Sequence, residues 1–113
     1  MKGLAQFLEF NCDRFFVDKR LVFVKAELWR ENEQTIGSKV TLQVVEDKTK
    51  YAKEGVTNFG EQFVVKVRGL EPLSFSKLKP LTTEIVISDV ERATVYGEYR
   101  NNLTLIATVK AVQ

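Results

Sequence analysis

The residues that could support catalysis are few, because the chain contains no histidine. Histidine is the commonest general base near neutral pH and a frequent metal ligand. The single cysteine, Cys12, cannot form a thiolate zinc site. Asp89 and Glu91 are spaced to share one face of a strand, where two carboxylates could hold a metal ion for nuclease chemistry. Arg92 follows them directly, which favours an ion-paired surface instead. We therefore expect no enzymatic activity, no metal and no cofactor.

Two other short patterns also favour structure over catalysis. Residues 37–39 read Gly-Ser-Lys, the end of a phosphate-binding loop, but the upstream glycine is missing and the context is strand rather than helix. Glu46 and Asp47 could hold a hard cation, yet Lys48 comes directly after them. We expect a hairpin turn at the first pattern and a solvated, ion-paired surface at the second.

Aromatic and basic residues recur together along the chain, and this combination suits single-stranded nucleic acid. Bases stack on aromatic rings, while Lys and Arg neutralise phosphates, and these contacts are common to DNA and RNA. The net charge is only +2, so such a site depends on where the charges lie and not on their sum. The candidate nucleic-acid-binding residues are Phe23, Lys25, Trp29, Lys48, Lys50, Tyr51, Lys53, Phe59, Lys66, Arg68, Tyr96, Tyr99 and Arg100.

The elements that must position these residues are short runs of β-branched and aromatic residues between turn residues. In the run 19–30, the even positions from 22 to 28 are all apolar, which predicts a half-buried strand with those positions facing the core. Phe23, Lys25 and Trp29 would then lie on the outer face of that strand.

Four further strands are expected at residues 39–45, 62–68, 83–99 and 103–112. Within 62–68, Phe63, Val65 and Val67 are predicted to face inward, and Val64, Lys66 and Arg68 outward. The run 83–99 is too long for one straight strand, so we expect a bend or bulge near residues 88–91. The segment 46–60 is charged and contains two glycines, which predicts a long exposed loop.

The order of these elements predicts the fold class. Pro72 and Pro80 limit the connection between the third and fourth strands to a helical turn or two. Five strands with such a connection are the layout of the OB-fold, a small, partly open barrel that binds oligonucleotides or oligosaccharides. We expect one mainly all-β, OB-fold-like domain over residues 1–113; an SH3-like barrel or a sandwich would give a similar strand pattern. The lone cysteine and the lack of an apolar run of about 20 residues predict a cytoplasmic protein with no membrane association.

The residues at 91–105, ERATVYGEYRNNLTL, together with the preceding residues 81–89, add a family resemblance. They resemble the closing hairpin of small OB-fold single-stranded DNA-binding proteins carried by phages and mobile elements of Gram-positive bacteria. The resemblance implies a protein of replication or recombination that coats single strands in the host cytoplasm, as a homodimer or higher homo-oligomer. It also implies a recombinase or polymerase as a candidate partner. Residues 108–113 read as strand, however, whereas the housekeeping proteins of this class end in an acidic, partner-recruiting tail.

The alternative is a protein–protein adaptor or structural module of a phage or mobile element. Phe23, Trp29 and Val64, all expected on the outer face, would then form an apolar interface.

Overall fold

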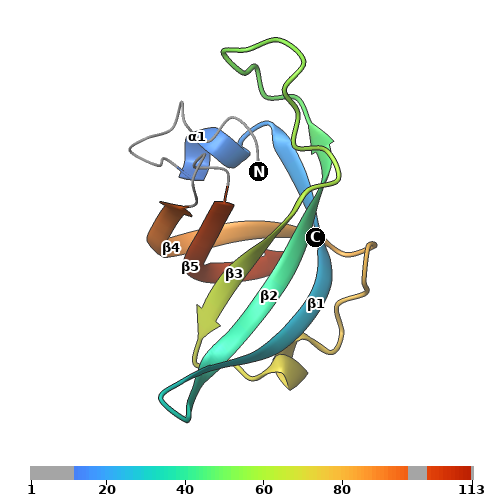
Figure 1. Ribbon diagram of the computed structural model, residues 1–113. Coiled ribbons are helices and arrows are strands. Elements are labelled where there is room, and N and C mark those ends of the chain that lie inside the picture. Colours follow the sequence, from blue (N-terminus) through green and yellow to red (C-terminus); the bar gives the residue numbers. More distant parts are fainter. Residues whose placement is uncertain (1–11, 97–101, 113) are drawn as a thin grey trace.

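The computed structural model describes residues 12–96 and 102–112 of the chain (Figure 1). Its elements are α1 (Cys12–Phe16), β1 (Lys19–Glu31), β2 (Gln34–Asp47), β3 (Gln62–Arg68), the 3-10 helix η2 (Pro72–Phe75), β4 (Glu84–Tyr96) and β5 (Asn102–Ala111).

The five strands close into a barrel in the order β1-β2-β3-β5-β4. Neighbouring strands are antiparallel except β3 and β5, which are parallel. The ladder between β1 and β4 is short, with Leu21 opposite Ile85 and Val22 opposite Glu84. The predicted all-β, OB-fold-like barrel with a short helical connection between its third and fourth strands is confirmed.

The core is filled by the inward-facing side chains of the strands. The two helices lie at opposite ends of the barrel (Figure 1), and each adds a buried aromatic ring to the core. Phe15 of α1 and Phe75 of η2 are both buried in this core. The alternation in β2 and β3 predicted the inward positions correctly, because both strands pair in regular register there. These positions are Val40, Leu42, Val44, Phe63, Val65 and Val67.

β1 contains a bulge that changes which residues face outward. Phe23 lies opposite Leu42 and Lys25 lies opposite Thr41, so Val24 is an extra residue without its own partner in β2. One extra residue inverts the alternation of faces on one side of the bulge. Phe23 is therefore 5% exposed and packs in the core. The prediction that Phe23 lies on the outer face is wrong.

After the bulge, β1 follows the predicted alternation more closely. Lys25 is exposed, and Trp29 packs under side chains of the outer face of β3. Leu28 is the exception, because it was expected in the core and is 51% exposed. At this end of β1 the described ladder continues only to β2, so no second neighbouring strand covers Leu28.

β4 bends where the sequence predicted. Ser88 lies opposite Thr108 and Arg92 lies opposite Ile106, so residues 89–91 of β4 occupy the space that a single residue of β5 spans. The first residue of this bulge has a φ of 50°, a left-handed conformation that Asp tolerates better than most residues. The bulge tilts the last part of β4 relative to its beginning.

The hairpin turn expected at residues 37–39 is wrong: these residues lie within β2, and the turn between β1 and β2 is at residues 32 and 33. Gly37 lies between Trp29 of β1 and Arg68 of β3 in the ladder. A Cβ atom at this position would lie 1.9 Å from the backbone carbonyl oxygen of Val67, a distance at which backbone must move. Glycine therefore allows β2 and β3 to approach closely below the outer face of the barrel.

We predict that Gly37→Ala destabilises the protein by about 2 kcal/mol, because overpacking against backbone cannot be relieved by rotating a side chain. Urea unfolding followed by circular dichroism measures this change. Thr35→Ala, an exposed substitution two residues away in β2, is the control and should change stability by less than about 0.5 kcal/mol. Equal midpoints for wild type and Gly37→Ala would contradict the close approach.

Candidate nucleic-acid interface

A groove of about 360 Å³ lies on the outer face of the barrel, between side chains of β1, β3, β4 and β5. Its cations are Lys66, Arg68 and Arg92, and its most exposed aromatic residue is Tyr96, with 49% of the residue accessible. Its lining residues are Trp29, Glu31, Lys66, Arg68, Arg92, Thr94, Tyr96, Thr104 and Ile106. Three cations beside an exposed ring are the chemical groups that bind phosphates and bases.

Trp29 forms the floor of this groove. The Nζ atom of Lys66 lies 5.3 Å from the centre of its ring, and the Cζ atom of Arg68 lies 5.1 Å from it. Both distances allow cation–π attraction. The indole N–H donates a hydrogen bond of 3.2 Å to Oε1 of Glu31. With only 2% of the residue exposed, Trp29 holds the two cations in place and offers no free ring face to a base.

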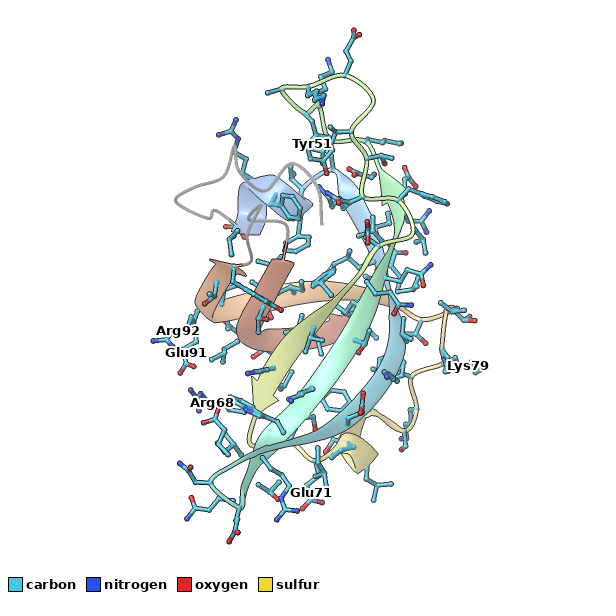
Figure 2. The ribbon with its side chains drawn as sticks, in the orientation of Figure 1. Tyr51, Arg68, Glu71, Lys79, Glu91 and Arg92 are labelled. Carbon is cyan, nitrogen blue, oxygen red and sulfur yellow. The ribbon has the colours of Figure 1, made fainter. Side chains whose placement is uncertain are left out.

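Arg68, which lines the groove, makes an ion pair with Glu91 of β4, which does not. Its Nε donates to Oε2 of Glu91 at 2.8 Å, and the two side chains are 53% and 54% exposed. Figure 2 shows Arg68, Glu91 and Arg92 gathered on one side of the barrel, with Lys79 on the other. Arg92 was not among the predicted site residues. Its place depends on the register of β4 with β5 and on closure of the barrel, which neighbouring residues in the sequence do not reveal.

The outer face next to the groove carries two more lysines. The Nζ atom of Lys25 lies 3.0 Å from Oε1 of Glu27 in an exposed ion pair. Lys39 lies in register between Glu27 on β1 and Lys66 on β3, so its side chain shares their face. Lys39 was also missed, although it is an odd-numbered position of the predicted strand 39–45 and the alternation places it outward.

The predicted residues of the loop between β2 and β3 lie at the other end of the molecule. Gly37, near the groove, and Asp47, where the loop begins, are separated by roughly 30 Å along β2 at about 3.3 Å per residue. The loop projects beyond the barrel at the end opposite the β1–β2 hairpin (Figure 1). The predicted site residues are thus divided between a groove and a separate loop.

The side chains of this loop differ in their exposure to solvent and in their contacts with the rest of the protein. Lys48 pairs with Oε1 of Glu46 at 2.8 Å, whereas Lys50 and Lys53 are exposed and have no ion pair among the described residues. Phe59 is 67% exposed. Tyr51, in contrast, packs against the core, and its hydroxyl donates to Oδ2 of Asp47 at 2.8 Å. Both its ring and its hydroxyl are engaged within the protein.

A buried ion pair fixes the base of the loop, so the solvated surface expected at Glu46 and Asp47 is wrong for Asp47. The ammonium of Lys19 lies 3.5 Å from Oδ1 of Asp47, and both side chains have no accessible surface. The same ammonium donates to the carbonyl oxygen of Phe15 and to Oγ1 of Thr49, each at 2.8 Å, and lies 3.7 Å from the centre of the Phe15 ring. Burial lowers the pKa of Lys19, and attraction to Asp47 opposes that shift.

Asp47 connects this ion pair to both ends of the loop. Its carboxylate accepts hydrogen bonds from the backbone N–H of Asn58 at 2.8 Å, from Tyr51 and from the backbone N–H of Thr49 at 3.1 Å. Burial pushes the pKa of Asp47 upward, but these hydrogen bonds outweigh burial and hold it below its ordinary value. Burial and donation to Asp47 raise the pKa of the Tyr51 hydroxyl.

Tyr99 and Arg100 lie outside the described residues. In residues 12–96 and 102–112, no group of three or more acidic, histidine or cysteine side chains could hold a metal ion. The expected apolar interface for an adaptor is wrong in two of its three residues, because Phe23 is buried in the core and Trp29 is buried under cations.

No protein-family model, curated protein or solved structure matches the chain. The likeness to phage-type single-stranded DNA-binding proteins therefore stays an expectation from the sequence. Within the described part of the chain, no helix has both the length and the apolar character needed to cross a membrane.

We predict that Asp47→Asn destabilises the protein by about 3 kcal/mol, because it leaves the buried Lys19 ammonium without its counter-charge. Urea unfolding at neutral pH measures the loss. Glu46→Gln, which removes the neighbouring, partly exposed carboxylate, is the control and should cost less than about 1 kcal/mol.

The same variant gives a readout specific to the charge of Asp47. A carboxylate with a lowered pKa stabilises the fold fully above its unfolded value, and this stabilisation is lost as pH falls through its folded pKa. The difference between wild type and Asp47→Asn should therefore shrink once the pH falls below 3.8, the ordinary value for aspartate. A difference that is independent of pH would contradict the ion-pair account.

Proposed function

We propose that this protein binds single-stranded DNA without sequence preference and coats it during replication or recombination. The observation that supports the proposal is the groove above Trp29, where Lys66, Arg68 and Arg92 surround a space that Tyr96 borders with an exposed ring. These residues come from three strands, and closure of the barrel brings them together.

Each group has a role in this proposal. The three cations contact successive phosphates, and Tyr96 stacks on a base. Stacking is tolerant of sequence because every base has a π-face. The neutral lining residues Thr94 and Thr104 add hydroxyls that can donate to phosphate oxygens.

Residues outside the groove extend this contact. Lys25 and Lys39 continue the cationic surface over β1 and β2, and the loop supplies Lys50, Lys53 and Phe59 for a longer strand. A nucleic-acid strand that reaches both the groove and the loop would run along β3, which connects the end of the loop to Arg68. Assembly into a homodimer or higher oligomer, and contact with a recombinase or polymerase, belong to the same proposal.

We predict that Tyr96→Ala weakens binding of a fluorescein-labelled oligo(dT) of about 12 nucleotides by about 5- to 150-fold, the range for loss of one base-stacking contact. Fluorescence anisotropy at about 50 mM salt measures the affinity. Tyr96→Phe keeps the ring and removes only the hydroxyl, so it should bind within about twofold of wild type. A strand bound equally well by the Ala variant would show that Tyr96 makes no stacking contact.

We also predict that Arg92→Gln reduces the slope of log affinity against log salt by about 0.7, the value for one phosphate contact to a single strand. The slope is measured by the same anisotropy assay between about 50 and 200 mM salt. Lys79→Gln removes an equal charge from the other side of the barrel (Figure 2) and should leave the slope unchanged. If wild-type protein left the labelled strand free at about 50 mM salt, the proposed function would be wrong.

A further inference from the structure

Glu91 is an acidic residue beside the cationic groove, and it is paired with one of the groove's three cations. It lies in the bulge of β4, and its carboxylate accepts a hydrogen bond of 2.8 Å from Nε of Arg68. Among the ion pairs of the described residues, Arg68 is the groove cation with a carboxylate partner, whereas Lys66 and Arg92 have none. Glu91 is not one of the residues that line the groove, and the acidic residue that does line it, Glu31, accepts the hydrogen bond of the Trp29 indole.

We propose that the carboxylate of Glu91 occupies the position of a phosphate on Arg68, and that a nucleic-acid strand binds by displacing it. This inference rests on the proposed function. It assigns Arg68 as one of the phosphate-binding residues and Glu91 as an internal competitor for that contact.

The chemistry of the two anions supports this exchange. A guanidinium binds carboxylate and phosphate oxygens in the same planar geometry, so one can replace the other without moving the cation. Arg68 is held over the Trp29 ring at 5.1 Å, which keeps the guanidinium at the groove when its partner changes. The indole thus fixes the cation, and the anion is the exchangeable part.

Because the pair is exposed to solvent, breaking it requires little free energy. Both side chains are more than half exposed, so Glu91 can turn into water after release. An exposed ion pair of this kind changes an equilibrium constant by a factor of about 1.4 to 5. The competition therefore weakens binding by only a few fold and does not prevent it.

This competition favours connected phosphates over isolated anions. A lone anion that binds Arg68 must displace Glu91 and gains only that one contact in return. A strand gains contacts with Lys66 and Arg92 at the same time, because all three cations line the groove. The ligand class that fits best is a polyanion with several phosphates in one chain.

The test is a double-mutant cycle of Glu91→Gln and Arg68→Gln, with binding of labelled oligo(dT) measured by anisotropy at about 50 mM salt. Glu91→Gln should bind about threefold more tightly than wild type. In the Arg68→Gln background the same change should give no gain, because no guanidinium remains to be released. Glu71→Gln is the matched control: it removes one exposed carboxylate at the start of η2, where the side chain makes no capping hydrogen bond. It should change affinity by less than about 1.5-fold.

Three outcomes would overturn this inference. An equal gain from Glu91→Gln in both backgrounds would mean that the carboxylate acts only through general charge repulsion. No gain in the wild-type background would mean that Glu91 does not compete. In both cases the proposed function stands, whereas failure of wild type and every variant to bind the strand would overturn the function as well. Urea unfolding of each variant confirms that these exposed substitutions leave the fold intact.

Discussion

A five-stranded sheet closes into a small barrel only if its long strands bend, and the outer surface of this protein depends on where they do so. β1 bends at Val24, which turns Phe23 into the core and leaves Trp29 on the outer face. β4 bends at residues 89–91, which brings its end beside Arg68 of β3. The groove is therefore a product of barrel closure, because its residues come from four strands and no single strand contains them.

The protein uses its charges in two physically different ways. The pair of Lys19 and Asp47 is buried and surrounded by hydrogen bonds, so it holds α1, β2 and the adjoining loop together. Separating the two charges would leave each of them buried without a partner, which is strongly unfavourable. The pair of Arg68 and Glu91 is exposed and makes one short contact, so its partner can be replaced. A net charge of +2 conceals this division, because it counts structural and exchangeable charges alike. The separation lets a nearly neutral protein present a cationic groove.

The sequence predicted those parts of the fold that follow from local alternation. It located five strands and the bend of β4, and it placed Lys66 and Arg68 outward, because β2 and β3 pair without a bulge in that region. It misplaced Phe23, since a period of two assumes that no extra residue interrupts the strand. It missed Arg92 because that residue reaches the groove through the long-range register of β4 and β5. The sequence predicted Tyr51 as a nucleic-acid-binding residue, because its hydrogen bond to a buried carboxylate leaves no pattern in the sequence.

The proposed function depends on binding of single strands in the groove above Trp29. The most direct test is a nuclear magnetic resonance titration of ¹⁵N-labelled protein with oligo(dT), because the chain has one tryptophan and its indole N–H gives one resolved signal. We expect this signal to move as the oligonucleotide is added, together with the backbone amides of Lys66, Arg68, Arg92 and Tyr96, and added salt to reverse the shifts. Unchanged signals in the groove, with the strand either free or bound elsewhere on the protein, would contradict this expectation.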